Sequence, residues 1–148
     1  MKIISHRANI NGIDEKNENS ISKIEKTIKK FDCEIDLWIW KNKLYLGHDK
    51  PQYEVDKKFL YKNINKLWIH AKNKKAVDFL HRTNLHWFWH DNDIMTLTSK
   101  NYIWVYPNNF FKNGITVIKD DTIEFPKYIM GICTDNPTFF ERIYGKQN

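Results

Sequence analysis

A chain of 148 residues is long enough for one hydrophobic core and too short for two ordinary domains, so we expect a single domain over residues 1–148. That length is well below the roughly 250 residues of a usual (β/α) barrel. The net charge of +6 favours anionic partners, such as a small phosphodiester or a lipid headgroup. Because the basic residues are scattered rather than gathered into a stripe, we do not expect nucleic acid as the partner.

The first half of the chain alternates strand-like and helix-like segments. A helix is expected after Asn19 or Ser20, either of which can cap it, because the apolar residues that follow fall on one helical stripe. Two strand-like runs on either side of Lys41-Asn42 predict a hairpin. The expected strands cover residues 2–6, 33–40, 43–47 and 66–72, and a second helix is expected over residues 73–82.

The second half continues the alternation in shorter segments. Strands are expected at residues 85–89, 102–106, 115–118 and 128–133, and a last helix at residues 137–144. Strands that alternate with helices predict a mostly parallel sheet. The intervals after residue 85 are too short for a full crossover helix after every strand. The predicted fold class is therefore α/β: a shortened or incomplete TIM-type (β/α) barrel with abbreviated helices in its second half.

The two cysteines predict neither a disulfide framework nor a zinc site. Cys33 and Cys133 are far apart in the sequence, and no Cys-x-x-Cys motif is present. We expect both to be buried free thiols in a reducing compartment. The N-terminal run leads at once into the candidate site, which leaves no room for a signal peptide, and no apolar run approaches transmembrane length. We therefore expect a cytoplasmic protein.

Two carboxylates lie two residues apart in the strand-like run over residues 33–40. Period-two alternation places Glu34 and Asp36 on one face of that strand and Cys33, Ile35 and Leu37 on the other. Two carboxylates on one face form half of a site for a hard cation such as Mg²⁺ or Ca²⁺.

Four short motifs follow one another in the first third of the chain, namely His6-Arg7, Glu18-Asn19-Ser20, Glu34-Ile35-Asp36 and His48-Asp49. Histidine titrates near neutrality and can act as a base or an acid, and the arginine fork matches two phosphate oxygens. Each motif alone matches by accident in many proteins. Their shared order along the predicted strands is what indicates phosphodiester chemistry.

This order of motifs resembles the glycerophosphodiester phosphodiesterase family, whose pattern reads HRG, then ENT or ENS, then ExD, then HD. The resemblance implies a phosphoric diester hydrolase that depends on a divalent metal ion, Mg²⁺, Ca²⁺ or Mn²⁺. By resemblance, Glu34 and Asp36 hold the metal and Arg7 contacts the substrate phosphate. His6 and His48 are then the catalytic pair, one as general base and the other as general acid.

The second half matches the family pattern more weakly. On its third strand the family commonly has a glutamate metal ligand with a lysine two residues later. Lys72 fits as a phosphate contact, whereas His70 stands at the glutamate position. We predict that His70 completes the metal site and moves its preference from Ca²⁺ towards Mn²⁺, and a phosphate contact or simple packing is its alternative role. Ala8 also replaces the usual glycine after His-Arg.

Other polar residues leave alternatives open. Asp135 either orients a group at the mouth of the barrel or caps the last helix, and we predict the cap because it precedes Pro137. His81 and His86 are expected to be surface or structural residues, while His90 either lies beside the site or packs among aromatic rings.

Two other functions compete with metal-dependent hydrolysis. One is a degenerate barrel that binds phosphorylated ligands without turnover. The second is a metal-independent, cyclising phosphodiesterase similar to phosphatidylinositol-type phospholipases C. The substrate alcohol, the attacking nucleophile (water or an internal hydroxyl) and the oligomeric state are not predicted.

Overall fold

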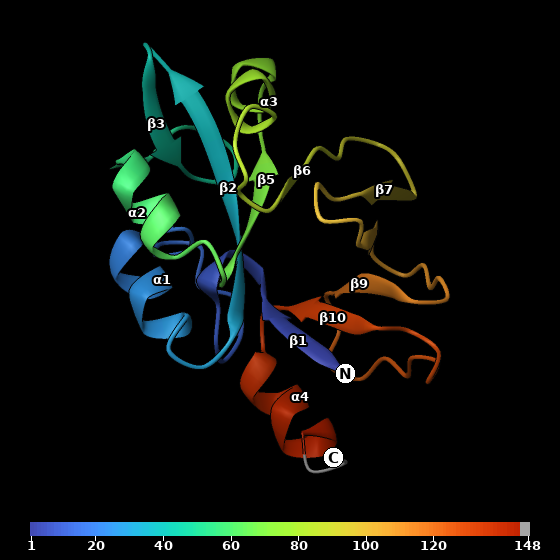
Figure 1. Cartoon of the computed structure of the whole chain (residues 1–148). Coiled ribbons are helices and arrows are strands. Elements are labelled where there is room, and N and C mark those ends of the chain that lie inside the picture. The colour runs from blue at the N-terminus through green and yellow to red at the C-terminus, as the bar shows by residue number, and fades with distance from the viewer. Residues whose placement is uncertain (146–148) are drawn as a thin grey trace.

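The computed structural model describes residues 1–145 and contains one strongly curled β-sheet with helices packed on its outer side (Figure 1). The sheet has ten strands: β1 (Lys2–Ser5), β2 (Asp32–Trp40), β3 (Lys43–Leu46), β4 (Tyr53–Val55), β5 (Leu67–Ala71), β6 (Trp87–Phe88), β7 (Met95–Leu97), β8 (Ile103–Val105), β9 (Gly114–Ile118) and β10 (Gly131–Thr134). The helices are a 3₁₀ turn η1 (His6–Ala8), α1 (Ile21–Thr27), α2 (Lys57–Lys62), α3 (Lys74–Leu80) and α4 (Pro137–Tyr144).

Parallel strands follow the order of the chain around the sheet. β1 pairs with β2, β2 with β5 and β5 with β6, while β8, β9 and β10 continue in parallel back to β1. β3, β4 and β7 are antiparallel additions outside this series. The predicted mixed α/β fold with a mostly parallel, curled sheet is therefore confirmed.

The curled sheet is open on one side. Within residues 1–145, β6 pairs only with β5, and β8 pairs only with β7 and β9. A loop bridges the opening, because the backbone N–H of Ser99 donates to the carbonyl of Trp87 at 2.8 Å. The rings of Phe88 and Trp104 also stack across it with centroids 4.5 Å apart. Ring stacking thus replaces strand pairing where the sheet does not close.

Within residues 1–145, the second half of the sheet is covered by the C-terminal helix α4 alone, whose Phe140 packs with Ile118 and Ile132, and crossover helices occur only in the first half. α1, α2 and α3 lie between the strands of that half, whereas the described chain has no helix between β6 and β10. The short intervals after residue 85 led us to expect this asymmetry. None of the helices within residues 1–145 is long and apolar enough to cross a membrane.

Most expected elements are present with their ends shifted by a few residues, but four short ones were not predicted. These are η1, β4, α2 and β7. Asp56 gives α2 a recognisable start, because its side chain accepts a hydrogen bond from the backbone N–H of Phe59 at 2.7 Å. Ser20 precedes α1 but makes no capping hydrogen bond through its side chain.

The two faces of the sheet bury different side chains. On the outer face, aliphatic residues of β2 and β5 such as Ile35 and Ile69 pack against the helices. On the inner face, Ile4, Cys133 and the rings of Trp68, Phe88 and Trp104 form a second cluster. Both cysteines are free and buried, as expected. These apolar layers stabilise the sheet by burial and leave the carboxyl ends of the strands to polar residues.

Candidate functional site

The seven residues that the sequence singled out line one cavity at the carboxyl ends of the parallel strands. Its volume is about 290 Å³. The seven are His6, Arg7, Glu34, Asp36, His48, His70 and Lys72. They come from β2, β5 and the segments that follow β1, β3 and β5. Parallel pairing brings these strand ends together, so residues spread over 67 positions of sequence meet in one place.

Glu34 and Asp36 point to the inner face of β2, as their alternation predicted. Glu34 is 2% exposed and Asp36 is 1% exposed. The backbone N–H of Arg7 donates to Glu34 Oε2 at 3.1 Å. Asn19 clamps Asp36 twice, donating from its side chain to Oδ2 and accepting from the Asp36 backbone N–H, both at 2.9 Å. The Glu-Asn-Ser motif thus supplies the amide that orients one carboxylate.

The two carboxylates differ in acidity. Burial and the neighbouring charge of Asp36 raise the pKa of Glu34 well above its ordinary value, because the charge of Arg7 offsets only part of them. Burial would also raise the pKa of Asp36, but hydrogen bonds from His48 and His70 and the charge of Lys72 hold it well below its ordinary value. Asp36 is therefore the firmly ionised member of the pair.

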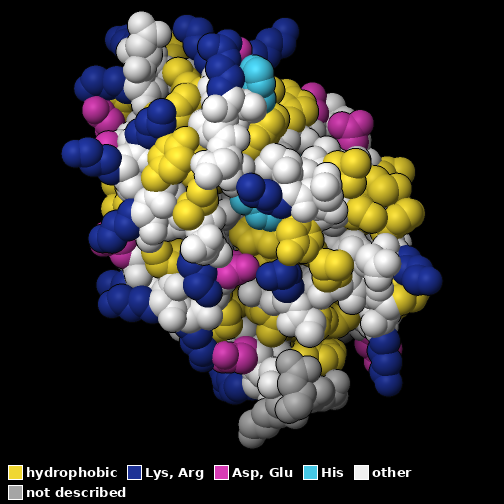
Figure 2. All heavy atoms as spheres, viewed as in Figure 1, with side chains coloured by type: hydrophobic (Ala, Val, Ile, Leu, Met, Phe, Trp, Pro, Cys, Tyr) yellow, Lys and Arg dark blue, Asp and Glu magenta, His cyan; other side chains and the backbone are white. Residues whose placement is uncertain are grey.

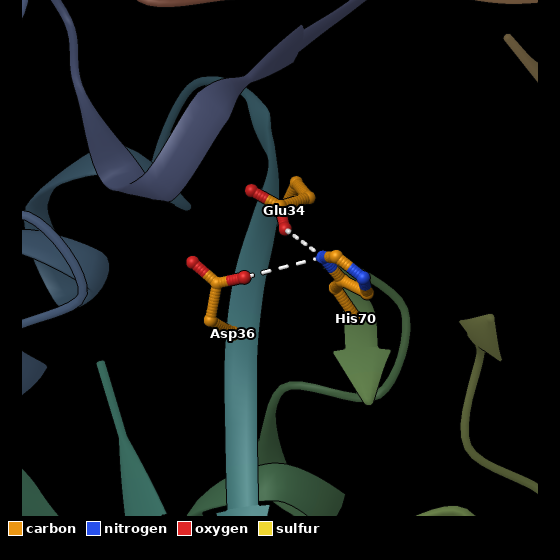
Figure 3. Close-up of side chains that lie close together, drawn as sticks. All are labelled: Glu34, Asp36 and His70. Atoms are coloured by element: carbon orange, nitrogen blue, oxygen red, sulfur yellow. Dashed lines mark ion pairs between the residues drawn. The ribbon is translucent and has the colours of Figure 1, made fainter. Parts of the chain in front are cut away.

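His70 directs one ring nitrogen at both carboxylates. Figure 3 shows its Nδ1 facing Asp36 Oδ1 at 3.2 Å and Glu34 Oε1 at 3.9 Å. Its Nε2 lies 3.1 Å from the carbonyl oxygen of His90, which can only accept, so Nε2 carries the proton. In a neutral ring, the Nδ1 lone pair therefore faces two acceptors. That arrangement requires a second proton or a bound cation between them.

These three residues fit a divalent cation. Their ligand atoms lie within 4.8 Å of one another, and they offer two carboxylate oxygens and one imidazole nitrogen. Asp36 Oδ1 is buried without a hydrogen bond of good geometry, although His70 Nδ1 lies 3.2 Å and Lys72 Nζ 3.4 Å away. A buried acceptor in this state has capacity for a metal ligand bond.

His6 is oriented by Asp135, which was predicted as a helix cap. His6 Nδ1 lies 2.9 Å from Asp135 Oδ1, and Asn9 donates to the same oxygen at 2.7 Å. The cap of α4 is instead Asn136, whose side chain accepts from the backbone N–H of Phe139. The cap prediction for Asp135 is therefore wrong, because Asn136 is one residue closer to the helix and already fills the position.

The acidity of Asp135 suits its contact with His6. Burial would raise the pKa of Asp135, but the hydrogen bond and charge of His6 and the hydrogen bond of Asn9 outweigh it and hold the pKa below its ordinary value. An ionised Asp135 accepts the proton of His6 Nδ1. His6 Nε2 is then the free, basic nitrogen of a ring that lines the cavity.

Arg7 lies at the centre of the polar contacts. Its guanidinium contacts Glu18 at 3.3 Å, Asp36 at 3.4 Å and His48 Nε2 at 3.0 Å. Burial lowers the pKa of Arg7, but the charges of Asp36, Glu34 and Glu18 together raise it above its ordinary value. Since arginine only donates, His48 accepts at Nε2, and its Nδ1 donates to Asp36 Oδ2 at 3.3 Å.

The η1 turn that presents His6 and Arg7 has left-handed backbone angles. Arg7 has φ of 52° and Ala8 has φ of 64°. Glycine adopts such angles without steric cost, whereas an alanine at this position is strained. Ala8 is nevertheless fully buried, and its carbonyl accepts a hydrogen bond from Thr27. The turn therefore keeps its shape without the glycine.

Sequence reasoning missed two contributors. Asn9 was not considered, and the carbonyl of His90 orients His70 although only the side chain of His90 was discussed. The other histidines behave as expected, since His81 is exposed and His86 is buried against Trp68 with a hydrogen bond to Thr98.

The fold and site together define a mixed α/β protein with a buried cluster of acids, histidines and cations at the open end of a curled parallel sheet. No family model, curated protein or solved structure matches the chain. The cluster itself is therefore the basis for the functional assignment that follows.

Proposed function

We propose that this protein is a metal-dependent phosphoric diester hydrolase and a short relative of the glycerophosphodiester phosphodiesterases, built on an incomplete TIM-type barrel. The observation that carries the proposal is the position of His70 Nδ1, which faces two buried carboxylates with its other nitrogen committed to a carbonyl. The same cavity is lined by Arg7 and by His6, which pairs with Asp135. A cation site beside a proton shuttle is what phosphodiester cleavage requires.

The acids and cations of the site have distinct roles in this proposal. Glu34, Asp36 and His70 would hold a divalent cation, which supplies Lewis-acid polarisation of the phosphodiester when bound. Arg7 and Lys72 would neutralise the charge of the phosphate oxygens, because both place their charged groups beside the carboxylate of Asp36.

The two histidines divide the proton transfers. His6 is the better-placed general base, because Asp135 holds its Nδ1 proton, so Nε2 is the nitrogen of a neutral ring that can accept a proton. His48 is the general acid in this assignment: Asp36 holds its ring in position, and its Nε2 must exchange the hydrogen bond from Arg7 for a proton before it can donate. The substrate is a small phosphodiester or a lipid headgroup.

One feature favours a metal-independent, cyclising enzyme as the second candidate. Arg7, His70 and Lys72 all lie within 3.4 Å of Asp36, so protein cations already compensate part of the acidic charge. Such an enzyme would use a hydroxyl of the substrate as nucleophile and release a cyclic phosphate. A degenerate barrel that binds phosphorylated ligands without turnover is the third possibility.

The deciding experiment measures hydrolysis of bis(p-nitrophenyl) phosphate with Mg²⁺, Ca²⁺ or Mn²⁺ and with EDTA. We expect metal-dependent turnover that falls by about 10²–10⁴-fold in His6→Ala and in His48→Ala, the usual contribution of a positioned proton donor or acceptor. His81→Ala is the matched control, since His81 is exposed and remote from the cavity.

Two results would redirect the assignment. EDTA-resistant formation of a cyclic phosphate from a diester with a neighbouring hydroxyl, followed by phosphorus NMR, would favour the cyclising enzyme. Absence of turnover on every diester, together with binding of phosphorylated ligands, would favour the degenerate barrel.

A further inference from the structure

The tip of the β2–β3 hairpin exposes an indole ring beside three lysines. Trp40, the last residue of β2, is 54% exposed. Together with Lys41, Lys74 and Lys75 it lines a shallow depression on the surface. Lys41 Nζ lies 6.0 Å from the centre of the ring. We call this group of four residues the Trp40 tip.

A single amide holds the Trp40 tip together. The side chain of Asn73 donates to the carbonyl of Ile39 at 3.0 Å and accepts from the Ile39 backbone N–H at 3.3 Å. The same oxygen accepts from the backbone N–H of Ala76 in the first turn of α3, so Asn73 also caps that helix. The hairpin is thus fastened to the segment that carries Lys74 and Lys75, which keeps the backbone of these lysines close to the end of β2.

The charge of the tip is uncompensated. Within residues 1–145, its three lysines form no ion pair, whereas the nearby acids Glu54 and Asp78 are paired with Lys43 and Arg82. Figure 2 shows lysine and arginine side chains gathered over the upper end of the molecule, where Figure 1 places the end of β2 and α3. An exposed indole ringed by free lysines matches the boundary of an anionic bilayer, where tryptophan enters the interface and lysine meets the headgroups.

The tip and the cavity face the same way. β2 runs four residues beyond Asp36 to Trp40, roughly 13 Å at the usual rise of a strand. The cavity opens at the carboxyl ends of the parallel strands, which is also the end of β2 that carries Trp40. A surface that contacted the tip would therefore lie on the open side of the cavity.

We propose that the Trp40 tip docks the protein onto anionic phospholipid bilayers. Single-stranded nucleic acid fits the tip less well, because sequential stacking needs several exposed rings and Trp40 is the one aromatic residue among those that line this depression. The docking surface goes beyond the proposed hydrolase activity and does not depend on it.

Flotation of the full chain with vesicles tests the proposal. Wild-type protein should float with vesicles of phosphatidylcholine and phosphatidylserine, and much less with phosphatidylcholine alone. Lys74→Gln with Lys75→Gln should lower the partition coefficient about 30-fold, at ~1 kcal/mol for each lysine near the surface. Trp40→Ala should lower the partition coefficient about tenfold, because the variant has no indole surface to transfer from water into the bilayer.

Matched variants separate docking from general effects. Tyr128→Ala removes another exposed aromatic ring, which precedes β10 at the opposite end of the parallel strands, and Lys26→Gln with Lys29→Gln removes two exposed lysines near α1. Both should float like the wild type, and near-ultraviolet circular dichroism verifies the fold of each variant. The proposal is overturned if wild-type protein ignores the anionic vesicles, or if the tip variants bind them as well as the controls do. Binding through Trp40 to single-stranded oligonucleotides but not to vesicles would overturn it equally.

Discussion

His6 and Asp135 lie 129 residues apart in sequence, yet Nδ1 of the one is 2.9 Å from Oδ1 of the other. The pair exists because β1 and β10 are parallel neighbours that end at the same level of the sheet, with Ser5 opposite Thr134. Each residue follows the end of its strand by one position. The carboxylate thereby fixes which nitrogen of the imidazole carries the proton and which faces the cavity.

Replacing Asp135 should therefore damage catalysis more than folding. Asp135→Asn offers an amide in place of the carboxylate, which weakens the preference for the productive tautomer, and we expect kcat to fall by about 10²–10⁴-fold. Asn136→Ala is the matched control, because removal of the α4 cap should cost about 1 kcal/mol of stability and leave turnover intact. Steady-state kinetics and urea unfolding of both variants check the prediction, and a loss of stability without a loss of turnover in Asp135→Asn would assign Asp135 a structural role.

The carboxylates of β2 should govern metal binding. Glu34→Gln and Asp36→Asn keep the size of each side chain and remove its charge, so each should weaken the binding of Mg²⁺, Ca²⁺ and Mn²⁺ by titration calorimetry, together with activity. Asp36→Asn should have the larger effect, because Asp36 contacts His70 more closely than Glu34 does. Undiminished metal affinity in both variants would mean that the cation binds elsewhere.

His70 should set which metal the site prefers. A glutamate at this position adds a negative charge and a hard oxygen, so His70→Glu should raise affinity for Ca²⁺ or Mg²⁺ and move the activity optimum towards those ions. His70→Ala should weaken metal binding, because it removes the nitrogen that faces both carboxylates. The measurement is a metal-activation profile for each variant. Profiles identical to the wild type would assign His70 to packing or to a phosphate contact.

His86 should make the fold sensitive to mild acid. Burial, with the nearby charges of Lys100 and Lys2, lowers the pKa of His86 from 6.5 to about 4. Between these values the unfolded chain binds a proton at this position and the folded protein does not, so acid favours unfolding. Above pH 6.5 this residue does not lower the free energy of unfolding. Between pH 7 and pH 5 the free energy of unfolding should fall by about 2 kcal/mol, because the unfolded chain takes up the proton.

Urea unfolding at several pH values measures this loss. His86→Gln cannot titrate, so its stability should vary less between pH 7 and pH 5 than that of the wild type. His81→Gln serves as the control, because His81 is exposed. An equal pH dependence in wild type and His86→Gln would show that His86 titrates normally in the folded protein.

Local sequence determined the parts of this protein that depend on short-range periodicity. The alternation in residues 33–40 was enough to place Glu34 and Asp36 on one face of β2, because successive side chains of a strand point to opposite sides. The mostly parallel sheet was predicted from the alternation of strands with helices, since a helical crossover returns the chain to start the next strand in the same direction. The short elements β4, α2 and β7 lacked enough residues to show a period.

Tertiary structure alone decided how the site is oriented. The pairing of His6 with Asp135 depends on the register between β1 and β10, and the tautomer of His70 depends on a carbonyl twenty residues away. The open side between β6 and β8 is likewise a matter of which strands pair across the sheet. Such contacts join segments whose local patterns are independent of each other, so residue periodicity carries no information about them. They arise only when burial of the two apolar layers fixes the strands in one arrangement.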